Sequence, residues 1–145
     1  MFLVHDPRLS LNGLSRMLRP SLQTLKHLRV KSFFNEWDST DPLSGLAYEL
    51  EEIRTIQSIE TISIDIAIYI NSNCPRGDEW GVLDETLARP GWSKLLQVSL
   101  GILIYSYQRK DDGLEEALKG LPEKQFHYLT LSGISFEFTV TSKLV

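Results

Sequence analysis

Residues 58–70 read SIETISIDIAIYI, and this stretch decides the fold because isoleucine occupies every second position from 62 to 70. Apolar residues at a period of two are typical of a β-strand with one buried face. The isoleucines would pack against helices, while Ser63, Asp65, Ala67 and Tyr69 would face the other way. We therefore predict a strand that is covered on one face only.

The apolar pattern of this stretch, at positions one, four and six, recurs along the chain. The copies begin at residues 25, 59, 95 and 126, so their spacings are 34, 36 and 31 residues. Units that repeat every 20 to 50 residues are typical of stacked or solenoid architectures. The copies are Leu25-x-x-Leu28-x-Val30, Ile59-x-x-Ile62-x-Ile64, Leu95-x-x-Val98-x-Leu100 and Phe126-x-x-Leu129-x-Leu131.

Helical patterns lie between these strands. DPLSGLAYELEEIR begins with Asp41 as a helix cap and Pro42 at the first helical position, and DDGLEEALKGLP begins with the capping-box-like pair Asp112 and Glu115. Shorter helical patterns end before Pro20 and Pro90. Helices alternating with strands over such long connections favour a parallel sheet. We predict a single α/β domain over residues 1–145, with about four helix-strand units and the helices on one face.

The last unit leaves two alternatives open. Its alternation changes phase at Ser132-Gly133, after which Ile134, Phe136, Phe138 and Val140 alternate. A glycine at such a point fits either a bulge in one strand or a turn between two strands. Residues 132–140 could thus form a bulged strand or a hairpin.

Composition narrows the class of protein. The single cysteine, Cys74, cannot form an internal disulfide, and no apolar run is long enough to span a bilayer. We expect a cytoplasmic or nuclear protein without membrane association. Net charge is −4, yet residues 1–35 carry six Lys/Arg against one Asp. Because aromatic residues do not interleave with these cations, we interpret them as solvated positions and expect no nucleic-acid binding.

No motif with a required spacing indicates catalysis. His5, His27 and His127 stand apart, without a second His or Cys at metal-ligand spacing, and no phosphate-binding loop or nucleophile elbow is present. We interpret the acidic pairs, among them Asp84-Glu85, as helix caps and solvated helix faces. The sequence thus predicts no catalytic residues, no metal site and no cofactor, and we expect no enzyme activity.

The outward positions of the strands predict a binding face. They are small, polar or charged, which suits recognition of a protein partner better than a buried core. The predicted partner-binding residues are His27, Arg29, Lys31, Thr61, Ser63, Asp65, Gln97, Ser99, Tyr128 and Thr130, with Gly101 and Ser132 beside them.

Beyond these patterns, the sequence resembles fungal leucine-rich-repeat-like proteins, many of which carry an F-box ahead of the repeats. The segments that carry the resemblance are LRPSLQTLKHLRV, DPLSGLAYELEEI, RGDEWGVLDETL, GWSKLLQVSLGI, LEEALKGLPEKQF and SFEFTVT. The resemblance implies a short leucine-rich-repeat-like solenoid that serves as a protein-interaction scaffold. It also implies the substrate-recognition region of an F-box-type ubiquitin-ligase adaptor, with a Skp1-like adaptor as partner only if an F-box is missing upstream.

One feature departs from the usual pattern of leucine-rich repeats. The ninth position of each unit, where leucine-rich repeats usually place Asn or Cys, holds Phe33, Ala67, Leu103 and Ile134, so the usual asparagine ladder is absent. The alternative function is a small-ligand-binding or hydrolytic α/β domain with a pocket at the strand ends. Its candidate residues are Arg76, Asp78, Glu79 and the run Arg109-Lys110-Asp111-Asp112.

Overall fold

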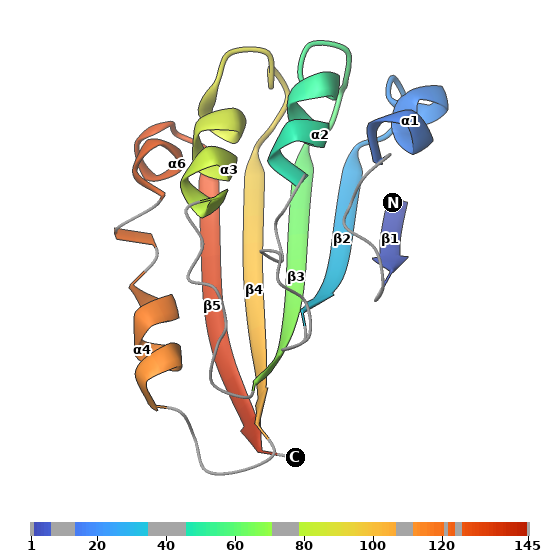
Figure 1. Cartoon of the computed structure of the whole chain (residues 1–145). Helices are drawn as coiled ribbons and strands as arrows, with labels where there is room; N and C mark the ends of the chain where they lie inside the picture. Colours follow the sequence, from blue (N-terminus) through green and yellow to red (C-terminus); the bar gives the residue numbers. More distant parts are fainter. Residues whose placement is uncertain are drawn as a thin grey trace.

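The computed structural model describes residues 2–6, 14–34, 46–70, 79–106, 112–120, 122–123 and 126–144. Its centre is a five-stranded sheet in which all strands are parallel and lie in chain order (Figure 1). The predicted α/β class with a parallel sheet is therefore confirmed. The strands are β1 (Phe2–Asp6), β2 (His27–Phe34), β3 (Thr61–Ile70), β4 (Gln97–Ser106) and β5 (Ser135–Leu144).

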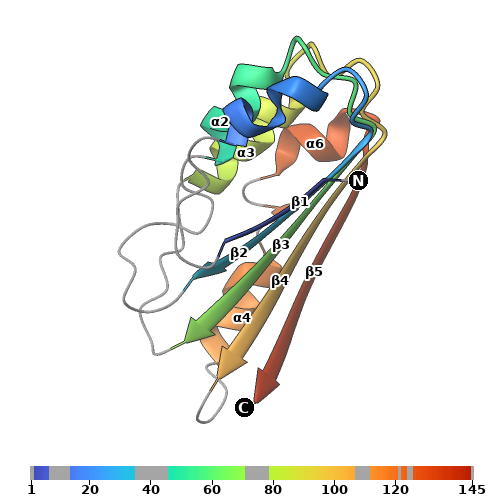
Figure 2. The ribbon, with the colours of Figure 1, turned by 90° about the vertical axis from the view of Figure 1, so that its right-hand side faces the viewer.

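Helices cover one side of this sheet, as Figure 2 shows in edge view. Each lies in a connection that carries the chain from the end of one strand back to the level where the next strand begins, so neighbouring strands are parallel. The order of the elements matches the prediction of helix followed by strand. The helical elements are α1 (Leu14–Leu18), η1 (Arg19–Ser21), α2 (Leu46–Ile53), α3 (Glu79–Ala88), α4 (Asp112–Lys119) and α6 (His127–Leu131).

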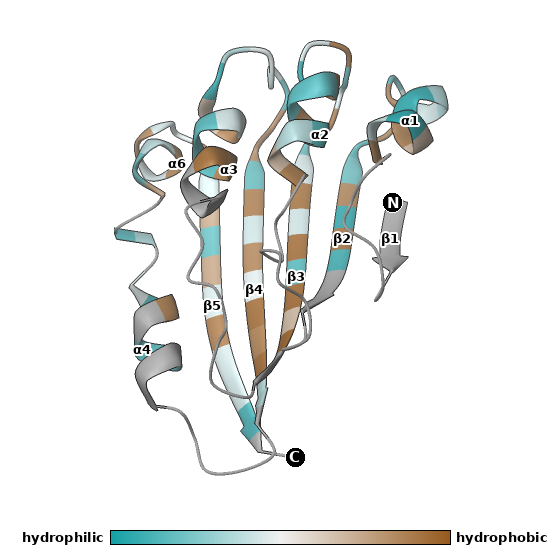
Figure 3. Ribbon diagram, in the orientation of Figure 1, coloured by the Kyte–Doolittle hydropathy of each residue, from teal (hydrophilic) through white to brown (hydrophobic). Residues whose placement is uncertain are grey.

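The core lies between the sheet and its helices. Ile62, Ile64, Ile66 and Ile68 of β3 are all at most 2% exposed, which confirms the face predicted from the isoleucine alternation. Their register partners on β4 are buried in the same way, and the alternating bands are visible along both strands in Figure 3. From the helices, Leu14, Leu46, Leu50, Leu83, Leu87 and Leu118 are buried against these strands.

The first three copies of the apolar pattern occupy equivalent places. Leu28 pairs in register with Ile62, and Ile62 with Val98. The same backbone hydrogen bond recurs just before the strands. The N–H of Glu60 donates to the carbonyl of Lys26 at 2.7 Å, and the N–H of Leu96 donates to the carbonyl of Glu60 at 2.8 Å. The three units therefore align along the sheet with offsets of 34 and 36 residues.

The fourth copy was predicted wrongly. Residues 127–131 form helix α6, and the strand that pairs with β4 begins at Ser135, so Val98 lies beside Phe136 rather than Leu129. Phe126 and Leu129 are three residues apart, a spacing that suits a helix as well as the first two positions of the strand pattern. Both side chains are fully buried, but from the helix layer.

Neither alternative for residues 132–140 is found. The chain turns at Ser132 and Gly133, where Gly133 has φ of +82°, and then runs as one strand paired in continuous register with β4 from Ser135 to Leu144. The glycine permits the left-handed backbone that separates α6 from β5. The change of phase in the sequence marks the end of a helix.

The structure also differs from the prediction at β1, and it describes only part of the predicted helix that contains α2. Strand β1 was not predicted, because residues 2–6 show no extended alternation. The expected caps Asp41 and Pro42 lie outside the described residues, and the structure describes α2 from Leu46 onward.

Candidate functional site

The opposite side of the sheet carries no helix among the described elements, and we call its outward side chains the open face (Figure 2). They alternate with the core positions, as the pleat of a strand requires. Each is exposed or half-buried. The open face comprises His27, Arg29 and Lys31 of β2, Thr61, Ser63, Asp65 and Ala67 of β3, Gln97, Ser99, Gly101, Leu103 and Tyr105 of β4, and Ser135, Glu137, Thr139, Thr141 and Lys143 of β5.

Parallel register arranges these side chains in rows across the strands. One row runs through His27, Thr61, Gln97 and Ser135. Within it the Nδ1 atom of His27 lies 2.6 Å from the hydroxyl oxygen of Thr61. The rows bring residues from four separate parts of the chain onto one surface.

The row through Gly101 holds two of the charged groups of the open face, Lys31 and Asp65. Lys31, Asp65, Gly101 and Thr139 are register neighbours, and Arg29 reaches diagonally so that its Nε donates to Oδ2 of Asp65 at 2.8 Å. The Arg29 and Asp65 side chains remain 44% and 41% exposed, so water screens the ion pair. Lys31 forms no ion pair with any residue that the structure describes.

Gly101 creates a depression of about 350 Å³ in the middle of the open face. A side chain at this position would fill it, because an added Cβ would lie 3.2 Å from Oδ1 of Asp65 and 3.4 Å from the hydroxyl oxygen of Thr139. Basic groups of β2 line one end and the threonine hydroxyls of β5 line the other, with residues of β3 and β4 in between. The lining residues include Arg29, Lys31, Asp65, Ala67, Leu103, Tyr105, Thr139 and Thr141.

Most of the residues predicted to bind a partner meet on this surface. Those of β2, β3 and β4 lie on the open face as expected, from His27 to Ser99. Tyr128 and Thr130 do not, because they belong to helix α6, and Ser132 follows it. The placement of these three residues was wrong for the same reason as the fourth copy of the pattern.

Sequence reasoning missed the part of the depression that β5 and the C-terminal half of β4 provide. Thr139 and Thr141 would have been found by extending the period of two from Phe136 through Val140 and reading the residues between. Leu103 and Tyr105 follow from the same alternation on β4. No sequence signal indicates that these four would surround a shallow cavity.

The alternative site at the strand ends falls mostly outside the described residues. Arg76, Asp78 and the run from Arg109 to Asp111 lie there, and of Glu79 and Asp112 only the helical backbone is described. Over the described part of the chain, no group of three or more His, Cys, Asp or Glu residues is placed to hold a metal ion. No helix among the described residues is long and apolar enough to cross a membrane.

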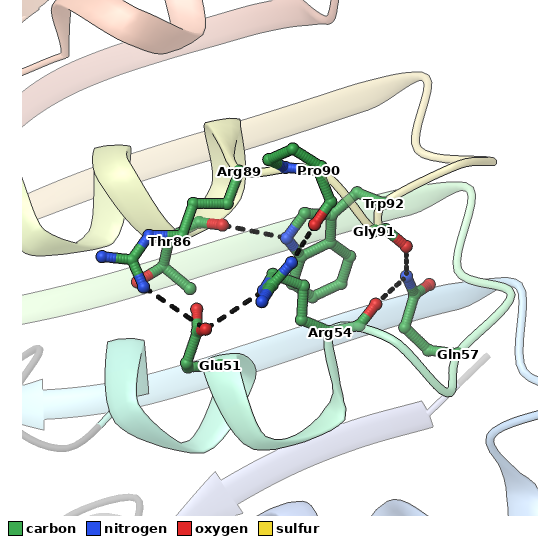
Figure 4. Close-up of polar contacts among 8 residues, drawn as sticks. All are labelled: Glu51, Arg54, Gln57, Thr86, Arg89, Pro90, Gly91 and Trp92. Carbon is green, nitrogen blue, oxygen red and sulfur yellow. Dashed lines mark hydrogen bonds and ion pairs between the residues drawn. The ribbon is translucent and has the colours of Figure 1, made fainter.

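Polar contacts on the helix side join the second and third units (Figure 4). The side-chain amide of Gln57 donates to the carbonyls of Arg54 at 2.9 Å and Gly91 at 3.0 Å, and its oxygen accepts the N–H of Ile59 at 2.6 Å. Arg54 also donates to the carbonyl of Pro90. These bonds fix the turn before β3 against the turn before β4.

The carboxylate of Glu51 provides a second link between these two units. Oε1 of Glu51 on α2 accepts from Nε of Arg54 at 3.1 Å and lies 3.3 Å from Nη1 of Arg89 (Figure 4). In the third unit, the indole N–H of Trp92 donates to the carbonyl of Thr86 at 2.9 Å. Trp92 is 6% exposed and belongs to the hydrophobic core.

Buried carboxylates cap helices of other units. Asp84 on α3 is 2% exposed and accepts the N–H groups of Tyr128 at 2.9 Å and Leu129 at 2.7 Å, which are free donors in the first turn of α6. Glu49 on α2 accepts the N–H of Ser15 at 3.0 Å in the same manner. Glu85 is exposed, as expected for a solvated helix position, whereas Asp84 is buried within α3 and caps a helix of another unit rather than its own.

Comparison with protein families, with curated proteins and with solved structures finds no match to this chain. The resemblance to leucine-rich-repeat-like proteins therefore stays a prediction.

Proposed function

We propose that the chain is a protein-interaction scaffold whose open face binds a protein partner around Gly101. The observation that carries this proposal is the depression of about 350 Å³ on a sheet face that no described helix covers. Exposed surfaces that combine apolar floor and polar rim are typical of recognition sites. The ammonium of Lys31 and the nearby threonine hydroxyls supply donors for a partner's acidic or carbonyl groups.

A leucine-rich-repeat-like solenoid is the architecture we propose for this scaffold. Parallel strands in chain order, offset by 34, 36 and 38 residues between the first residues of β2, β3, β4 and β5, support it. Repeat proteins present extended surfaces that suit binding of large partners. The absence of an asparagine ladder means that the turns are held differently, and Gln57 with its three hydrogen bonds is one such device.

The role in an F-box-type ubiquitin-ligase adaptor is a further step that rests on the resemblance alone. In that role the open face would select the substrate, and a Skp1-like adaptor would bind an F-box encoded upstream. We propose no enzyme activity for the chain, because its sequence carries no motif with the spacing that a catalytic site requires.

Filling the depression provides the test. Gly101→Val should leave the fold intact, since the atoms nearest the added Cβ are the ends of the Asp65 and Thr139 side chains. Ser93→Val, at an exposed turn before β4, is the matched control. Affinity purification from the source cells, followed by mass spectrometry, should recover partners with the wild type and the control that Gly101→Val loses. Equal recovery by all three proteins would count against the open face as the binding site.

A further inference from the structure

The outer edge of β5 is the longest free edge of the sheet that the structure describes. β5 has ten residues and lies last in the strand order, whereas β1 at the other edge has five. The N–H of Ser135 donates to the carbonyl of Leu96 at 2.9 Å, so Ser135 and every second residue after it direct their backbone groups toward β4. The backbone groups of residues 136, 138, 140, 142 and 144 therefore point outward.

β5 carries two charged side chains, Glu137 and Lys143, but neither a proline nor a bulge interrupts this edge. Edge strands are commonly protected by proline, by a bulge or by a helix lying over the edge. β5 contains no proline, and its pairing with β4 runs without a break from Ser135 to Leu144. Figure 1 shows α4 and α6 beside β5 at this edge, and Figure 2 shows both of them toward the helix side of the sheet. No strand among the described residues pairs with this edge, so it can accept a further strand.

The apolar side chains of β5 are less deeply buried than those of β4. Phe136, Phe138 and Val140 pack against the core but stay half-buried, while their register partners on β4 are at most 2% exposed. The difference arises because β4 has a strand on both sides and β5 on one. A strand added at this edge would cover these three side chains.

The sequence of β5 is complementary to itself in the antiparallel direction. Glu137 lies three residues before Val140 and Lys143 three residues after it, with Thr139 and Thr141 between. A second copy related by a two-fold axis at Val140 places each Glu137 opposite Lys143 of the second copy. Each Thr139 then lies opposite Thr141 of that copy. Opposite charges and paired threonines facing each other across strands are both stabilising.

We propose that β5 pairs antiparallel with β5 of a second copy of this chain, about a two-fold axis at Val140, to form a symmetric homodimer. The axis falls on a residue whose backbone groups point outward, so the two Val140 residues can exchange both of their hydrogen bonds. The same register pairs residue 136 with 144 and residue 138 with 142, which engages the outward groups along the whole strand. The dimer joins the two open faces into one surface.

The alternative arrangement, head to tail through β5 and β1, is less favoured. β1 offers five residues to a ten-residue strand. Such a contact would also not close, because a heterologous contact generates an open filament unless its rotation closes a ring. The two-fold pairing is closed and uses the full length of β5.

Charge exchange tests the register. The full chain is examined by sedimentation velocity over a wide range of concentrations. We expect the wild type to form a dimer and Lys143→Glu to raise its dissociation constant about 30-fold, because two symmetric pairs become repulsive; that change corresponds to about 2 kcal/mol. Glu137→Lys should have the same effect, and the double exchange Glu137→Lys/Lys143→Glu should restore dimerisation. Lys26→Glu, at an exposed position just before β2 and separated from β5 by β3 and β4, is the control and should not change it.

A second variant probes the backbone. Val140→Pro removes an outward N–H at the axis, and an edge strand tolerates proline where its N–H faces away from the sheet. We expect this variant to be monomeric with the circular dichroism spectrum of the wild type. A wild type that stays monomeric at every concentration, a dimer insensitive to the single charge reversals, or a double exchange that does not restore pairing would each overturn the proposal.

Discussion

Replacement of Asp84 by alanine tests how the units hold one another. The carboxylate is 2% exposed and accepts two N–H groups from α6, 44 and 45 residues further along the chain. Without it, the N–H of the fully buried Leu129 has no acceptor, which costs about 1–3 kcal/mol. Tyr128 is 57% exposed, so water can reach its N–H and the loss there is about 0.5–1 kcal/mol. Together these give about 2–3 kcal/mol, allowing for the desolvation that the carboxylate no longer suffers.

Urea unfolding, followed by circular dichroism, measures this loss. Glu85→Ala is the matched control, because Glu85 is the exposed neighbour on the same helix and should change the free energy of unfolding by less than about 0.5 kcal/mol. Asp84→Asn should lie between alanine and the wild type, since an amide oxygen can accept only part of what the carboxylate accepts. If Asp84→Ala and Glu85→Ala have equal effects, the long-range cap does not hold α6 in place.

Three further sets of variants test other contacts of the sheet and its turns. Gln57→Ala should lower the free energy of unfolding by about 2–3 kcal/mol in urea, because three hydrogen bonds that link the turns of two units are lost. Gly101→Val should raise it by about 0.5–1 kcal/mol in the same assay, since glycine inside a strand is destabilising, and a fall would show that the contact with Asp65 is not relieved by rotation. A double-mutant cycle of Arg29→Ala and Asp65→Ala should give a coupling energy below about 1 kcal/mol, because both side chains are over 40% exposed; a larger value would mean that the pair is shielded from water.

The sequence predicts the fold where one periodicity dominates. The isoleucines of β3 and the apolar residues of β4 alternate over ten-residue strands, and their burial matches the alternation. Because parallel register then follows from equivalent positions in each unit, the β2, β3 and β4 part of the open face was predicted as well. Local patterns of this length leave little choice between structures.

The fourth unit shows where sequence reasoning fails. Three apolar positions from Phe126 onward fit a strand pattern and a short helix equally, and the helix is selected by Asp84, a residue 43 positions before His127. A five-residue helix is not stable by its own hydrogen bonds and needs such tertiary contacts. No local pattern could have indicated this cap. The error moved Tyr128 and Thr130 onto the open face and hid Thr139 and Thr141.

The depression itself was beyond sequence reasoning for a different reason. Gly101 was read as one more small outward residue, and its effect depends on the groups that the register places beside it. The side chains of Lys31, Asp65 and Thr139 come from three other strands. Only the register shows that a missing side chain at their centre leaves a cavity.

Site-specific photocrosslinking in the source cells tests the central claim, that the open face is the partner-binding surface. A photoreactive amino acid is placed at Ser99 on the open face, and at Tyr48, which is 69% exposed on α2 of the helix side. The account predicts that the probe at Ser99 yields a discrete covalent adduct with a partner protein, that Gly101→Val abolishes this adduct, and that the probe at Tyr48 yields none. An adduct of the same partner through Tyr48, with none through Ser99, would contradict it.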